Sequence, residues 1–179
     1  MKIYMSNIKE IKNIADIENA LPVSDRIRLS KFSNNTRKLQ FLLSRAIVKN
    51  VTGESVKVDK NGAPIIKSGF VSIAHKDNFV MVAVSNSGVG IDIENASVNR
   101  DFAEQSELLG LPKTKDKDAF YKNFVKYEAE FKFGNDAEQA HKYFYKLGDY
   151  LICVCSQETI KDIEFILSDV PLPNFVCAE

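Results

Sequence analysis

The spacing of apolar residues along the chain predicts three helices. Leucine, alanine and isoleucine recur every three or four residues from Asn34 or Asn35 to about Val51, which predicts an amphipathic helix. A similar run over 119–133 predicts a long helix capped by Asp118. A shorter helix is expected over 26–31, after a cap at Ser24 or Asp25.

Alternating or short apolar runs predict strands. Residues 79–84 and 89–93 are expected to pair across the turn at 86–88, and Asp59–Gly62 is a strong turn signal. The other predicted strands are a short N-terminal edge strand in MKIYM, then 55–59, 64–66, 143–145, 150–155 and 163–167. The order of helices, strands, helix and strands indicates an α+β fold, with a helix packed on an antiparallel sheet in each half.

The composition is that of an ordinary globular chain, with 45% hydrophobic and 27% charged residues. No apolar run approaches the roughly 18 residues that span a bilayer, and the N-terminus lacks a signal-peptide core. We therefore expect a cytoplasmic protein without a membrane partner. The net charge is zero, yet ten Lys or Arg face two acids between Arg26 and Lys67. This excess favours a small phosphorylated ligand over nucleic acid.

The cysteines are read as structural. Cys153 and Cys155 alternate with apolar residues in LICVC, so both thiols lie on one face of a predicted strand, and Cys177 follows near the end. A buried pair is the favoured interpretation, because a metal or redox role lacks a second ligand pair.

The strand Gly90-Ile91-Asp92-Ile93-Glu94 carries the most informative chemistry. Asp92 and Glu94 are two residues apart, so both project to one face while Val89, Ile91 and Ile93 pack on the other. Adjacent carboxylates repel unless a cation is present, and Mg²⁺ prefers such oxygen ligands. The alternative is a strand with a solvated polar face.

Two further sets of polar residues are candidates. Ser72 and His75, just before a predicted strand, could donate to a phosphate, although His75 could equally be a structural hydrogen-bonding residue. Glu128 and Lys132 lie one turn apart on the long helix, beside an apolar stripe of Phe124, Ala129 and Phe131. Their alternative interpretation is a surface ion pair.

Together and in this order, these segments resemble the Sfp-type 4′-phosphopantetheinyl transferases. That family has a G-[IV]-D-[IV]-E strand, which residues 90–94 match in full, and then a W-x-x-K-E-A/S-x-x-K helix. In the second motif Glu128, Ala129 and Lys132 match, whereas Phe124 and Tyr127 replace the tryptophan and the first lysine.

Upstream segments are similar too, so that the resemblance covers about residues 26–134. Asn61-Gly62-Ala63-Pro64 is similar to the family's Gly-Lys-Pro turn with alanine for lysine, and residues 72–75 keep the histidine of its S-x-S-H segment. Lys31-Phe32 and the helical segment around Arg45 also correspond.

The resemblance implies Mg²⁺-dependent transfer of the phosphopantetheine arm of coenzyme A to a serine of an apo acyl or peptidyl carrier protein. It implies Mg²⁺ on Asp92, Glu94 and Glu128, with Glu128 as the base and Lys132 on the phosphates. The residues expected to contact coenzyme A are Lys31, Arg45, Asn61, Gly62, Ala63, Pro64, Ser72, His75 and Lys132.

The resemblance also implies a monomer of two similar halves related by a pseudo-twofold. Residues 1–90 would bind coenzyme A, and residues 91–179 would supply the metal site and catalytic helix. The lysines of segment 95–117 could dock an acidic carrier, or this segment is a solvated loop. The alternatives to transfer are a coenzyme A-binding homologue without activity and a non-enzymatic interaction module.

Overall fold

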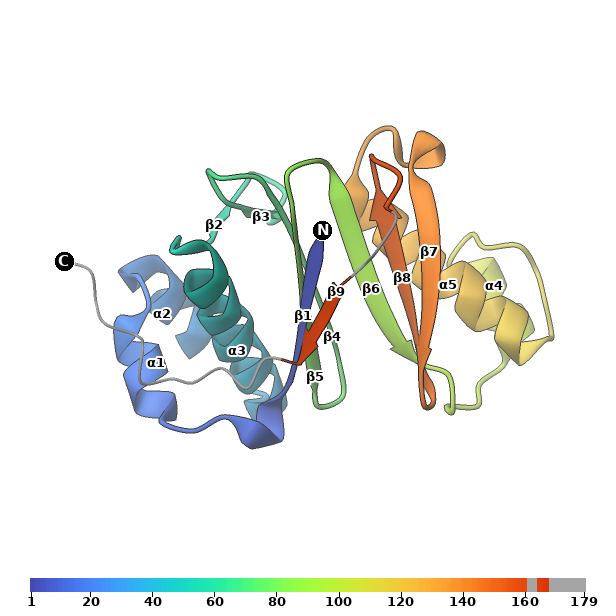
Figure 1. Ribbon diagram of the computed structural model, residues 1–179. Coiled ribbons are helices and arrows are strands. Elements are labelled where there is room, and N and C mark those ends of the chain that lie inside the picture. The colour runs from blue at the N-terminus through green and yellow to red at the C-terminus, as the bar shows by residue number, and fades with distance from the viewer. Residues whose placement is uncertain (161–163, 168–179) are drawn as a thin grey trace.

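The computed structural model describes residues 1–160 and 164–167 and has a mixed α+β architecture (Figure 1). Three helices lie beside a four-stranded sheet, and two more lie beside a three-stranded sheet. The helices are α1 (Ile14–Ala20), α2 (Val23–Ser30), α3 (Asn35–Thr52), α4 (Phe102–Leu108) and α5 (Lys117–Phe133), with 3-10 turns at Ile8–Glu10 and Ala137–Gln139. In the described part of the chain, no helix has the length and apolar character needed to cross a membrane.

The strands form three small sheets. They are β1 (Lys2–Asn7), β2 (Lys57–Val58), β3 (Pro64–Ile65), β4 (Phe70–Lys76), β5 (Phe79–Ser85), β6 (Val89–Asn95), β7 (His141–Leu147), β8 (Tyr150–Ser156) and β9 (Glu164–Leu167). The first sheet has the order β4-β5-β1-β9, the second is the β2–β3 hairpin, and the third has the order β6-β8-β7. All described pairs are antiparallel except β1 with β9.

The two long helices form where the apolar spacing predicts them. The Asn34 side chain accepts a hydrogen bond from the Arg37 amide at the start of α3, and Gly53 ends this helix in the left-handed region. The cap predicted for α5 is wrong, because Asp116 accepts from the Ala119 amide while Asp118 lies inside the helix. The caps predicted for the short helix are also wrong: α2 begins at Val23, after Pro22, and neither Ser24 nor Asp25 caps it.

Two predictions of strand pairing are wrong. The N-terminal strand β1 is not an edge strand, because it lies between β5 and β9. β5 and β6 do not form a hairpin: β5 pairs with β4 and β1, whereas β6 pairs with β8. The segment 86–88 therefore carries the chain from one sheet to the other. Periodicity specifies the faces of a strand but not its partner, which depends on contacts distant in sequence.

β4 lies next to β6, and the two larger sheets meet there. The Ser72 hydroxyl on β4 accepts a hydrogen bond from the Ile91 amide at 3.0 Å. One apolar cluster joins residues of β1, β5, β6 and β8, and a second lies between α3 and the first sheet. The pseudo-twofold and the division at residue 90 stay predictions; the chain returns to the first sheet through β9. The C-terminal tail with Cys177 lies outside the described residues.

Candidate functional site

The site begins on β6, whose two faces differ in the way the sequence predicts. Val89, Ile91 and Ile93 belong to the apolar cluster between the sheets. Asp92 and Glu94 project to the opposite face and are only 6% and 8% exposed. The alternative of a solvated polar face is therefore wrong, since both carboxylates are buried.

Gly90 lets α5 lie directly on this polar face of β6. A Cβ atom at Gly90 would lie 2.1 Å from the Ala129 carbonyl oxygen and 2.7 Å from the Phe133 amide nitrogen. The helix can therefore approach this closely only over a glycine. The approach brings the Lys132 ammonium and the Glu128 carboxylate of α5 toward Asp92.

Lys132 and Asp92 form a close, largely buried ion pair. The Lys132 Nζ lies 2.6 Å from Asp92 Oδ1 and also donates to the Ile91 carbonyl at 3.2 Å. The other oxygen, Asp92 Oδ2, is buried without a hydrogen-bond partner. Burial raises the pKa of Asp92 to about 6, against the pull of Lys132 and with repulsion from Glu94 and Glu128.

A second lysine, which the sequence did not single out, faces Glu94. The Lys76 Nζ lies 2.6 Å from Glu94 Oε2, off the direction that a hydrogen bond to this oxygen would need. Lys76 stands at the end of β4, and only the adjacency of β4 and β6 brings it here. The carboxylate pair is thus neutralised by one lysine from each half of the chain.

His75 precedes β5 as predicted, but it lies inside β4, a strand that was not predicted from the sequence. The Arg37 Nη1 contacts the His75 ring, 2.8 Å from Nδ1. Burial, together with repulsion from Arg37, Lys132 and Lys76, lowers the pKa of His75 to about 4. The imidazole is therefore neutral near pH 7, and the cation at this position is Arg37. Arg37 was not among the residues predicted from the sequence, although a basic residue in the first turn of a helix was a usable signal.

Other residues expected to contact coenzyme A have structural contacts. Arg45 is buried, 3.2 Å from Asp25 Oδ2, and its guanidinium lies 4.4 Å from the Phe41 ring centroid. Ser72 is buried in its hydrogen bond to β6, and Lys31 is exposed at the end of α2. The charge of Arg45 is already compensated, which leaves Lys31 and Arg37 as the more available cations.

A cleft of about 570 Å³ meets this charged cluster at Lys132. Ala63 and Pro64 of the β2–β3 hairpin line one side, and Lys132 and Phe133 at the end of α5 line another. Lys132 therefore connects Asp92 with the cleft. Asn61, Gly62 and the three carboxylates Asp92, Glu94 and Glu128 are not among its lining residues.

The donor chemistry fits a hard divalent cation, although the ligands are not gathered for one. Among residues 1–160 and 164–167, no group of three or more His, Cys, Asp or Glu side chains lies ready to hold a metal ion. Asp92 and Glu94 supply only oxygen atoms, and the unpaired Asp92 Oδ2 is an acceptor without a donor. Cys153 and Cys155 are free, buried thiols packed with Val125 and Ala129, which confirms the buried pair.

The exposed side of α5 differs from the predicted apolar stripe. Ala129 is buried, with Phe120 and Val125, but Phe131 is 75% exposed. Phe131 thus belongs to the outer face of the helix together with Tyr127. Ala129 and Phe131 are two residues apart, which is about 200° around a helix, so one faces the core when the other faces solvent.

Comparison with known proteins adds no family. No protein-family model and no curated protein sequence matches this chain.

Proposed function

We propose that this protein transfers the 4′-phosphopantetheine arm of coenzyme A to a serine of an apo acyl or peptidyl carrier protein. The observation that carries the proposal is the position of Lys132, which is 2.6 Å from Asp92 and also lines the cleft. Lys132 of the second motif thus connects the cleft with Asp92 of the G-[IV]-D-[IV]-E strand, which does not itself line the cleft. The resemblance over residues 26–134 supplies the reaction class, and it also implies two similar halves related by a pseudo-twofold.

Coenzyme A would lie in the cleft with its pyrophosphate toward Lys132. The lysine ammonium pairs with phosphate oxygens as a point charge, and Arg37, Lys31 and neutral His75 can bind the other phosphate. The hairpin tip at Ala63 and Pro64 would contact the nucleotide.

Mg²⁺ fits the oxygen ligands Asp92, Glu94 and Glu128, and when bound it neutralises the pyrophosphate and stabilises the charge of the leaving group. In this structure Lys76 and Lys132 supply the positive charges beside Asp92 and Glu94. Loading the ion therefore requires that these lysines yield at least part of their contacts.

Glu128 is the base of the proposed reaction. It accepts the proton of the carrier serine hydroxyl while the serine oxygen bonds to the β-phosphorus of coenzyme A. The bond from that phosphorus to the bridging oxygen breaks, and adenosine 3′,5′-bisphosphate leaves with the electron pair. Glu128 is half-buried on α5, so it can reach both the cation and an approaching carrier.

The test is intact-mass spectrometry of an apo acyl carrier protein after incubation with this protein, coenzyme A and Mg²⁺. A mass gain of one phosphopantetheine arm is expected, and both EDTA and Asp92→Ala should abolish it. Several apo carriers from fatty-acid, polyketide and peptide synthases are tried, and no gain with any of them would refute the transferase proposal.

A second candidate is a coenzyme A-binding protein without transferase activity. The specific observation in its favour is that Lys76 and Lys132 already neutralise the carboxylates, while Ala63 and Tyr127 stand where the family has lysines. Calorimetric titration with coenzyme A distinguishes the two, because this candidate binds the ligand and modifies no carrier.

A further inference from the structure

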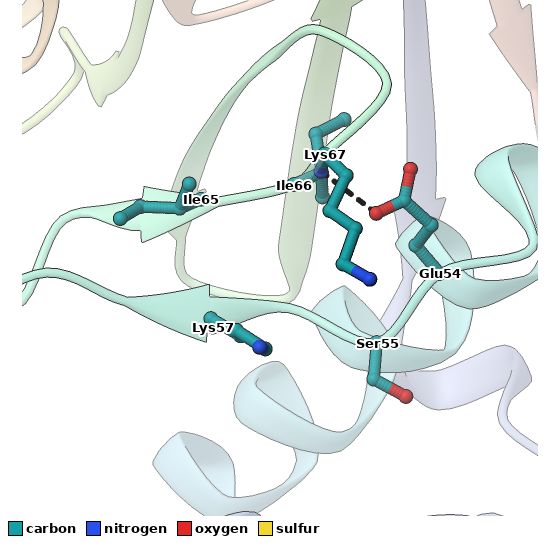
Figure 2. A pocket seen from close by; sticks show the side chains of 6 residues that line it. All are labelled: Glu54, Ser55, Lys57, Ile65, Ile66 and Lys67. Atoms are coloured by element: carbon teal, nitrogen blue, oxygen red, sulfur yellow. Dashed lines mark hydrogen bonds between the residues drawn. The ribbon is translucent and has the colours of Figure 1, made fainter.

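The β2–β3 hairpin is a thin wall between two hollows. On one side, Ala63, Pro64 and Ile65 line the cleft of the proposed coenzyme site. On the other side lies a pocket of about 280 Å³ lined by Glu54, Ser55, Lys57, Ile65, Ile66 and Lys67 (Figure 2). Ile65 lines both hollows, so the wall is one hairpin thick. Any tilt of the hairpin changes the width of the cleft.

Little packing holds the outer part of this hairpin. Its ladder consists of two residue pairs, Lys57 with Ile65 and Val58 with Pro64. Val56 and Ile66 at the base are buried in the cluster against α3, whereas Val58 and Ile65 are 46% and 45% exposed. The base is therefore anchored, and the part beyond it stands free of the core.

The tip of the hairpin is rigid within itself. Asp59 Oδ1 accepts hydrogen bonds from the amides of Asn61 and Ala63, both at 2.8 Å. Gly62, in the left-handed region, completes the turn. The tip residues that line the cleft consequently move together with the strands. The orientation of the hairpin therefore depends on the contacts at its open end, where the chain enters and leaves it.

Glu54 holds the open end of the hairpin together. Its carboxylate joins the segment that enters the hairpin to the segment that leaves it: Oε2 accepts from the Lys67 amide at 2.7 Å and Oε1 from the Ser68 amide at 2.9 Å. Figure 2 shows the Glu54 carboxylate beside the Lys67 backbone, past the ends of the two strands. Hydrogen bonds from Ser68 and Lys67 lower the pKa of Glu54, so this exposed group is charged at neutral pH.

We propose that Glu54 is a positioning residue that holds the β2–β3 hairpin against the cleft, so that its tip contacts bound coenzyme A. This inference rests on the proposed function, because it assigns the hairpin to the coenzyme side of that site. Only a carboxylate supplies two equivalent acceptor oxygens for the two amides. Glutamine keeps the shape but offers one acceptor, and alanine offers none.

Limited trypsin digestion tests the first half of this inference without any ligand. Lys57, Lys60 and Lys67 are exposed on the hairpin, and the cleavage rate at these lysines reports how often the hairpin opens away from its folded position. Glu54→Gln and Glu54→Ala should be cleaved at these lysines about tenfold faster than the wild type, the effect of losing a hydrogen bond to a charged acceptor. The matched control is Glu18→Gln, the same charge change at an exposed position of α1.

Steady-state kinetics and calorimetry test the second half. Glu54→Gln and Glu54→Ala should raise both the Kd and the KM for coenzyme A by about tenfold, with kcat within about twofold of the wild type. A general loss of structure would instead lower kcat and the melting temperature together. Coenzyme A should also protect the wild-type hairpin from trypsin.

Each outcome is decisive. Equal cleavage of the Glu54 variants and the Glu18 control would overturn the inference, and so would faster cleavage with unchanged affinity for coenzyme A. A wild type that neither binds coenzyme A nor is protected by it refutes the proposed function and the assignment of the hairpin to coenzyme contact. In that case the cleavage rates still decide whether Glu54 holds the hairpin.

Discussion

Asp92 is buried and His75 is half-buried in the same charged cluster, where the pKa of Asp92 is raised and the pKa of His75 is lowered. Asp92 is protonated more readily in the folded protein, with a pKa of about 6, while His75 resists protonation down to about pH 4. Each charged form lacks hydration there, and burial is the first cause of both shifts. Burying these two groups therefore lowers the free energy of unfolding, as is common where charges are arranged for reactivity.

The Asp92→Asn variant should show this cost in its pH dependence. The folded-state pKa of Asp92 lies above its unfolded value of 3.8, so the wild type loses stability as the pH rises from about 4 to about 6. At pH 7.5 we expect the variant to be more stable by up to about 3 kcal/mol, and near pH 4 nearly equal to the wild type. Urea unfolding in EDTA at both pH values measures the difference.

Only the difference between variant and wild type isolates Asp92. The lowered pKa of His75 acts in the opposite sense, because it removes stability as the pH falls from about 6.5 toward 4. This contribution is common to both proteins and cancels to first order. A stability difference that is the same at pH 4 and pH 7.5 would contradict the assigned pKa of Asp92.

Ala63 is the residue at which a cation can be restored to the cleft. Ala63→Lys would place an ammonium on the cleft wall, and we expect about tenfold tighter binding of coenzyme A at low salt, decreasing as salt is added. Ser55→Lys is the matched control, since Ser55 lines the pocket on the other side of the hairpin. Calorimetric titration measures both; equal gains in the two variants would mean that the cleft wall has no special role.

At the level of elements, the contact of α5 with β6 decides whether the site exists. The helix brings Glu128 and Lys132 to Asp92 because Gly90 leaves no side chain between helix and strand. The lysine that pairs with Asp92 is forty residues away in sequence. A single close approach therefore assembles the proposed catalytic groups.

Gly90→Ala should push α5 away from β6. The added methyl group would meet backbone atoms, which cannot turn aside, so we expect a loss of about 1–3 kcal/mol in unfolding free energy and a larger fractional loss of transfer activity. The control is Gly88→Ala, whose methyl group would meet only the Phe133 ring and the Gln157 side chain, at 3.2 Å and beyond. Denaturant unfolding and the carrier mass assay compare the two variants, and equal losses would argue against a special role of Gly90.

At the scale of the whole molecule, one acid links the two larger sheets. Asp77, at the turn between β4 and β5, accepts hydrogen bonds through Oδ2 from Asn95 at 2.8 Å and from the Tyr150 hydroxyl at 2.9 Å. The Tyr150 ring also meets Phe79 edge-on, with centroids 5.0 Å apart. This link joins the sheets at the opposite end of β4 from the cleft.

Tyr150→Phe should remove the hydrogen bond and keep the ring contact with Phe79. We expect a loss of about 1–2 kcal/mol in unfolding free energy, as for a hydrogen bond to a charged acceptor. A double-mutant cycle with Asp77→Asn measures the coupling, since asparagine tolerates the positive φ of this position. Strictly additive effects would mean that the hydroxyl and the carboxylate do not stabilise one another.

The sequence by itself determined the features that depend on neighbours within a few residues. The long helices, the turn at Asp59–Gly62 and the shared face of Asp92 and Glu94 follow from periodicity and local geometry, and the structure has them all. Local patterns reveal which side of an element is apolar, because side-chain direction repeats with the backbone.

Only the tertiary structure decided which elements meet. It placed β1 inside its sheet, paired β6 with β8 and separated it from β5. It also set Lys76 against Glu94 and Arg37 against His75, and it enclosed Arg45 with Asp25. These contacts are chosen by the free energy of packing whole elements together, and residues dozens of positions apart contribute to that choice at once.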